Sequence, residues 1–124
     1  MNIDQKAEKL ALVLTKETSL NKLEWKHVNR APAYFSEGTN DIYPMFFKTK
    51  YKEQNIGVFE KRYKHFIDED TFIWGTSFGL CMLDNFNDVS WAIDSSSLAV
   101  ANLFEVASEQ ASGISDVLDD LLES

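Results

Sequence analysis

The two histidines and the single cysteine are the side chains best suited to chemistry in this chain of 124 residues. His27 and His65 each stand near aromatic residues, at positions that strand alternation places on an inner face. Cys81 lies within the apolar run FGLCML. No Cys, Asp or Glu stands at metal-ligand spacing around either histidine, and nothing near Cys81 favours a thiolate. The pattern therefore favours packed histidines and a buried thiol over a zinc site or a nucleophile.

The segment DNFND, residues 84–88, comes nearest to a calcium-binding loop. Phe86 occupies its third position, where such a loop places an oxygen ligand, and neither the mid-loop glycine nor the glutamate at the twelfth position follows. The segment therefore predicts a hairpin turn. The chain also lacks a glycine-rich phosphate loop and a Gly-x-Ser-x-Gly motif. We expect no metal and no cofactor, and the sequence favours a non-enzymatic protein.

Charge is distributed unevenly along the chain. All 12 lysines and arginines lie in the first 64 residues, whereas 12 of the 20 acidic residues follow Lys64, and the net charge is −8. An acidic protein repels nucleic acid unless a local basic patch outweighs its field. The charge balance therefore disfavours nucleic acid as a partner.

The lysines of the central segment leave a nucleic-acid interpretation open. KTKYK, residues 48–52, has lysine at every second position, as a solvated strand face or a protected edge strand also would. Single-strand binders combine such basic rows with exposed aromatic rings. The acidic balance makes the solvated face the favoured interpretation. The residues that would form a binding platform here are Lys48, Lys50, Lys52, Arg62, Lys64, Tyr34 and Phe35.

The order of the expected elements predicts an α+β fold in a single domain, residues 1–124. Apolar residues at helical spacing indicate an N-terminal helix from Ile3 to about Lys16. An antiparallel β-meander of about four to five strands follows, starting with the alternating segment KLEWKHV, residues 22–28. Two C-terminal helices complete the chain, because Gly113 interrupts the helical pattern and a second apolar edge begins after Ser115.

The centre of the meander is predicted to be a hairpin closed by a three-residue loop, residues 55–57. A positive φ at Gly57 would then set the aromatic rows of Phe47 and Phe59 on one face. The next long segment, residues 71–84, is apolar on both faces, as in a central strand covered on both sides. DED, residues 68–70, would form the turn before it. We expect one core made by Leu10, Leu14, Trp25, Phe78, Leu80, Met82, Trp91, Ile93, Leu103 and Phe104.

Two segments carry candidate binding residues. The connection over residues 29–44 is long for a compact domain, and connections of that length are often functional, although this one would also serve to cover the end of the sheet. Its candidate ligand or partner residues are Tyr34, Phe35, Glu37, Asp41 and Tyr43. The last helix would present an acidic partner surface, with added charge from the DED turn. That surface consists of Asp116, Asp119, Asp120 and Glu123, with Asp68, Glu69 and Asp70 beside them.

The C-terminal segment LFEVASEQASGISDVLDDLLES, residues 103–124, carries the most specific resemblance in the chain. Leu103-Phe104, Gly113-Ile114 and Val117-Leu118-Asp119 are similar to a recurrent ending of small orphan proteins of bacterial mobile gene pools, including integron gene cassettes. The layout of a helix, a Trp-containing strand and a meander resembles the same group. The resemblance implies a bacterial accessory protein and transfers no catalytic or binding residue, because most of these proteins have no known function.

These observations favour a non-enzymatic accessory protein that binds a protein partner or a small ligand, with a second copy of the chain as one candidate partner. The alternative is an immunity-type inhibitor whose acidic half occupies the basic cleft of a toxin; a toxin-like gene beside this one would favour it. Single-strand nucleic-acid binding is a third, less favoured hypothesis. The lone cysteine, the polar N-terminus and the lack of any apolar stretch near 18 residues favour a cytoplasmic protein without a membrane segment.

Overall fold

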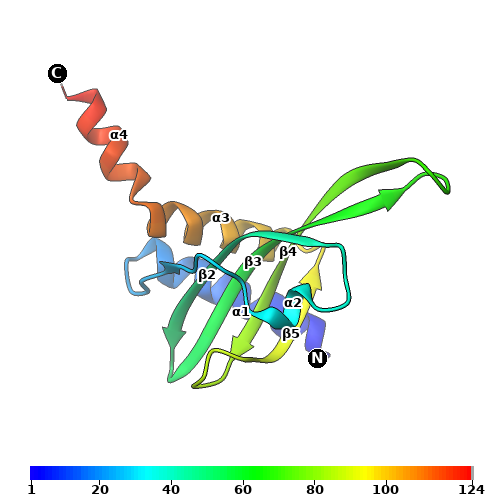
Figure 1. Ribbon diagram of the computed structural model, residues 1–124. Coiled ribbons are helices and arrows are strands. Elements are labelled where there is room, and N and C mark those ends of the chain that lie inside the picture. The colour runs from blue at the N-terminus through cyan, green and yellow to red at the C-terminus, as the bar shows by residue number, and fades with distance from the viewer. Residues whose placement is uncertain (124) are drawn as a thin grey trace.

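The computed structural model describes residues 1–123 and has the expected α+β architecture: an N-terminal helix, a five-stranded antiparallel sheet and two C-terminal helices (Figure 1). The sheet is a simple meander, because each strand pairs with the next one in sequence. The helices are α1 (Ile3–Ser19), α2 (Ala33–Ser36), α3 (Leu98–Ser112) and α4 (Ile114–Leu122). The strands are β1 (Lys26–His27), β2 (Ile42–Tyr51), β3 (Gln54–Phe66), β4 (Phe72–Leu83) and β5 (Val89–Ser95).

Both faces of the sheet are covered near its centre. On one face, α1 and α3 pack on the strands around the fully buried side chains of Leu14, Leu80 and Leu103. On the other face, α2 and its flanking segments cover a smaller cluster that includes Phe46 and Phe59. Figure 1 shows α2 in front of the sheet and α1 and α3 behind it. The ten residues expected in one core all belong to the larger cluster, either buried or packed against it, so that prediction is confirmed.

Strand β1 is shorter than predicted because the backbone groups of the residues before it form hydrogen bonds with side chains and not with the β2 backbone. The Gln110 side chain reaches from α3, accepting from Trp25 N at 2.8 Å and donating to Leu23 O at 3.0 Å. Thr49 Oγ1 donates to the Glu24 carbonyl oxygen at 2.8 Å. Buried backbone groups need one partner each, and these bonds supply it without a longer strand. The predicted strand is therefore confirmed only for the two residues of β1.

The turn of the β2–β3 hairpin comes earlier than predicted. Lys52 and Glu53 form it, with φ values of 48° and 66°, and a two-residue turn of this kind matches the twist of paired strands. Gly57 lies within β3 instead. Only glycine fits at this position, because a Cβ atom there would be 2.6 Å from Phe46 Cζ and 2.7 Å from Cys81 Sγ. The predicted loop is therefore wrong. The shifted register also places the two aromatic rows on opposite faces of the sheet.

The β3–β4 hairpin extends beyond the other strands. Strand β2 pairs with β3 only as far as Arg62, and β5 pairs with β4 only as far as Phe78, whereas β3 and β4 stay paired to Phe66 and Phe72. We call residues 63–75 the arm; Figure 1 shows it projecting from the body of the molecule. The prediction of a strand covered on both sides therefore holds for the second half of β4 and is wrong for its first half.

The buried centre of β4 gives a test of the fold. Leu80 has 0% of its surface exposed, and Leu80→Ala should lower the free energy of unfolding by about 2–5 kcal/mol, the usual cost of emptying such a site. Chemical denaturation measures this loss. Leu98→Ala is the matched control, because Leu98 is 74% exposed and should change stability by less than about 0.5 kcal/mol. Equal midpoints for the two variants would contradict the placement of β4.

Candidate functional site

The connection between β1 and β2, predicted as a binding loop, covers the second face of the sheet. Phe35 of α2 is buried, and its ring centroid lies 4.6 Å from that of Phe59 and 5.0 Å from that of Tyr43. Tyr34 is exposed at the surface. A hollow of about 280 Å³ opens beside these rings. Of the five candidate residues, Tyr34, Phe35, Asp41 and Tyr43 line this hollow, whereas Glu37 is exposed outside it.

Lys61 occupies one side of this hollow and pairs with two carboxylates. Its Nζ lies 2.7 Å from Asp94 Oδ2 and 3.6 Å from Asp41 Oδ2. Burial disfavours the charged ammonium, yet the hydrogen bond and charge of Asp94 prevail and raise the pKa of Lys61 above its ordinary value. Burial also raises the pKa of the Tyr43 hydroxyl, against the opposing effect of Lys61. The Lys61 ammonium therefore offsets part of the negative charge of the two carboxylates, and the ion pairs attach the connection to β3 and β5.

The histidines and the cysteine do not assemble a catalytic group. His27 shares a face of the sheet with the buried Phe47, as predicted, but both His27 and His65 are exposed. His27 packs on Phe47 with ring centroids 5.4 Å apart but lies on the edge strand, and His65 lies on the uncovered arm. Cys81 is buried as predicted, and burial raises the pKa of its thiol to about 12. The thiol stays protonated at neutral pH and is unsuited to nucleophilic attack.

The DNFND segment is a hairpin turn, as predicted. Asp84 Oδ1 accepts hydrogen bonds from Phe86 N at 2.8 Å and from Asp88 N at 3.0 Å. The carboxylate that would begin a calcium loop therefore stabilises the turn itself. Within residues 1–123, no three His, Cys, Asp or Glu side chains are grouped so that they could hold a metal ion.

The structure separates the residues of the predicted nucleic-acid platform. Lys48 pairs with Gly57, whereas Arg62 and Lys64 lie at positions of β3 that face the other side of the sheet. Of the two expected stacking residues, Phe35 is buried and Tyr34 is exposed. Lysines of β2 and lysines at or near the β1 edge of the sheet instead line a hollow of about 320 Å³. Its basic lining residues are Lys22, Lys26, Lys48 and Lys50.

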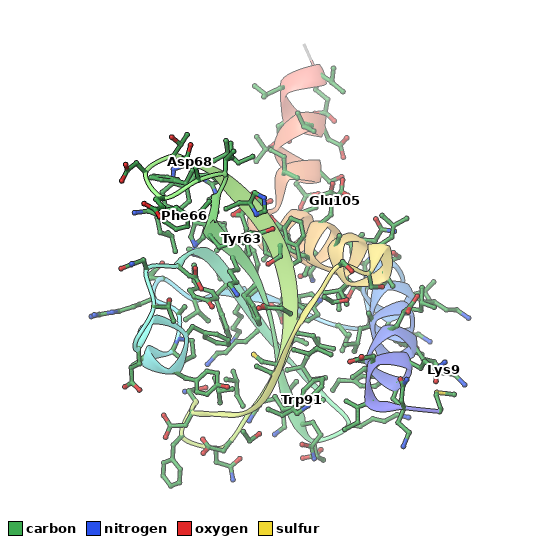
Figure 2. The ribbon with its side chains drawn as sticks, turned by 90° about the vertical axis from the view of Figure 1, so that its right-hand side faces the viewer. Lys9, Tyr63, Phe66, Asp68, Trp91 and Glu105 are labelled. Carbon is green, nitrogen blue, oxygen red and sulfur yellow. The ribbon has the colours of Figure 1, made fainter. Side chains whose placement is uncertain are left out.

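The arm exposes large apolar side chains. Phe66, Phe72 and Trp74 form a row along one of its faces, with ring centroids 5.6 Å apart for each successive pair. Lys64 Nζ lies over this row, 4.7 Å from the Phe72 centroid and 5.9 Å from that of Trp74. We call these four residues the aromatic face of the arm. Phe66 is 58% exposed and Trp74 is 49% exposed, and Figure 2 shows Phe66 near the end of the projecting hairpin.

Helix α4 also projects without a covering layer (Figures 1 and 2). Gly113, in the left-handed conformation with φ 65°, ends α3 and turns the chain into α4. No residue of α4 is buried. Its apolar edge is 40–82% exposed and consists of Ile114, Val117, Leu118, Leu121 and Leu122. Its polar side carries Asp116, Asp119 and Asp120, followed by Glu123 at the C-cap, and no ion pair within residues 1–123 involves them.

The predicted acidic surface is thus limited to α4. Figure 1 shows α4 and the tip of the arm diverging from opposite ends of α3, so the DED turn adds nothing to that surface. The aromatic face of the arm was not predicted as a site. Its signal was present in FIDEDTFIW, residues 66–74, where apolar residues flank an acidic turn on both sides, but a buried strand gives the same pattern.

Comparisons with protein families, with curated proteins and with solved structures found no match for this chain. The resemblance to proteins of mobile gene pools therefore stays a prediction. No helix within residues 1–123 is long and apolar enough to cross a membrane.

The buried thiol provides a test of the site description. In the folded protein at pH 8, Cys81 should react with a thiol reagent only as fast as the sheet opens, because the thiol is inaccessible and its pKa is near 12. In denaturant the same thiol should react at once. The control is Asn85→Cys, which adds a thiol in the exposed turn and should react rapidly in the native state. Rapid labelling of native Cys81 would show that the second face of the sheet is open.

Proposed function

We propose that this protein acts by binding another protein rather than by catalysis, and that α4 and the arm form its binding surface. The observation that supports this most strongly is α4, an amphipathic helix of nine residues with no buried side chain. Water-soluble monomers rarely leave large contiguous apolar patches uncovered, and such patches usually mark interaction sites. The aromatic face of the arm is a second patch of the same kind.

Both projecting elements are too small to be stable on their own. Isolated helices shorter than about 12–15 residues are marginal in water, because most helix stability in proteins comes from packing of the apolar face. A two-stranded ribbon without a third strand or a covering helix is marginal as well. Fully burying one leucine contributes about 1.5–3 kcal/mol. A partner that covered α4 and the arm would therefore stabilise both.

The exposed residue types suit protein recognition. Tryptophan is among the residues that dominate the energetics of interfaces, and Trp74 belongs to the arm's aromatic face, where its ring contacts that of Phe72. An amphipathic helix with apolar residues at i, i+3, i+4 and i+7, as at Ile114, Val117, Leu118 and Leu121, is a common way of filling an apolar groove. The cytoplasmic setting and the bacterial accessory role expected from the sequence belong to the same proposal.

Site-specific photocrosslinking in cells that produce the protein tests this proposal. A benzophenone amino acid in place of Trp74 or Leu121 should give protein adducts, because both positions lie on the proposed surface. The control position is Phe86, which is 84% exposed but lies in the turn before β5, and it should give none. Adducts no stronger at 74 and 121 than at 86 would overturn the proposal. An adduct with a strongly basic foreign protein at position 121 alone would favour the immunity-type inhibitor instead.

A further inference from the structure

The two uncovered surfaces cannot satisfy each other within one chain. Helix α4 continues from the C-terminal end of α3, whereas the arm begins beside the N-terminal end of that helix, and Figure 1 shows the two diverging. In both figures they nevertheless project to the same side of the body. The molecule therefore presents two separated, diverging projections on the same side of its body.

The charges of the two surfaces are opposite. Helix α4 and its C-cap carry four carboxylates and no lysine or arginine. The aromatic face of the arm carries the Lys64 ammonium, and Arg62 precedes it on the same side of β3, where its guanidinium also pairs with Glu60 at 3.7 Å. The carboxylate of Asp68 lies farther out, in the turn, where it accepts hydrogen bonds from the backbone of Asp70 and Thr71. A helix lying near the base of the arm would thus place its carboxylates beside basic residues and away from the acidic tip.

We infer that the partner is a second copy of this chain, in a two-fold dimer in which α4 of each copy packs on the aromatic face of the other copy's arm. This inference rests on the proposed function and names its partner. In such a dimer a two-fold axis lies between the projections and relates each α4 to the arm of the other copy. The two contacts are equal and the assembly closes as a dimer, as in most symmetric homo-oligomers.

The contact has the composition of a stable interface. The apolar edge of α4 lies on the aromatic row, which supplies a desolvated centre, and carboxylates with Lys64 and Arg62 form a polar rim. Salt screens the surface ion pairs of the rim, but the apolar centre accounts for most of the affinity. High salt should therefore weaken the dimer only moderately.

Light scattering after size exclusion tests this arrangement on the full chain. The wild-type protein should have twice the 14.2 kDa mass of one chain. Leu118→Asp on α4 and Trp74→Thr on the arm should each weaken self-association at least roughly thirty-fold, the loss typical of removing a central interface side chain. Both side chains are about half exposed in the single chain, so circular dichroism should show the fold unchanged. Phe86→Asp is the matched control and should remain dimeric.

Mixing the two defective variants distinguishes reciprocal packing from other modes. The Leu118→Asp chain keeps a normal arm and the Trp74→Thr chain keeps a normal α4, so a mixed dimer regains one intact contact. At a concentration where each variant alone is monomeric, the mixture should therefore form dimers. A helix-to-helix or arm-to-arm dimer would gain nothing from mixing, and that result would overturn the inference.

A monomeric wild-type protein would also overturn the inference. If photocrosslinking at positions 74 and 121 still captured a different protein, the binding function would stand and only the identity of the partner would be wrong. If neither self-association nor any crosslinked protein were found, both the inference and the proposed function would fail.

Discussion

The pairing of β3 with β4 beyond the reach of β2 and β5 sets the shape of the molecule. Its register runs without interruption from Asn55 opposite Leu83 to Phe66 opposite Phe72. Where the neighbouring strands are present, two helices cover one face and the α2 connection covers the other. Where they end, the same two strands have no layer to bury their side chains. The arm is therefore a direct consequence of unequal strand lengths, which also leave its aromatic rings exposed.

The uneven distribution of charge has a local explanation for part of the acidic half. Asp68 and Asp84 each accept backbone hydrogen bonds in a turn, and Asp94 pairs with Lys61. The carboxylates of Asp116, Asp119 and Asp120 have no hydrogen bond or ion pair within residues 1–123. A row of like charges on a short helix does not stabilise that helix by itself. No interaction within the described chain therefore explains these three acids.

Element order, core and the last two hairpin turns could be predicted because their signals are local. Helical spacing around Leu14, the apolar run around Leu80 and the turns at residues 68–70 and 84–88 need only neighbouring residues. The errors arose from tertiary contacts. The Gln110 side chain, 85 residues from Trp25 in sequence, accepts a backbone hydrogen bond that a longer β1 would otherwise need to satisfy. The crowding that requires a glycine at position 57 comes from side chains on the two strands adjacent to β3.

The candidate site was predictable only in part for the same reason. The apolar run of residues 72–74 indicates a strand, but only the lengths of β2 and β5 decide whether that strand is covered. The exposure of α4 likewise depends on the direction in which the chain leaves Gly113. The acidic residues of α4 were identified from sequence as a candidate surface, whereas its apolar edge was not. The structure makes this edge, together with the arm, the stronger functional signal.

Hydrogen exchange measured at two protein concentrations tests most directly whether α4 is held by a second copy. The account predicts that amides of α4 and of the arm are protected at a concentration where the dimer forms and exchange rapidly after dilution to the monomer. Amides of β3 and β4 around Val58 and Leu80, which are fully buried within one chain, should stay protected at both concentrations. Exchange in α4 that does not change with concentration would contradict the account.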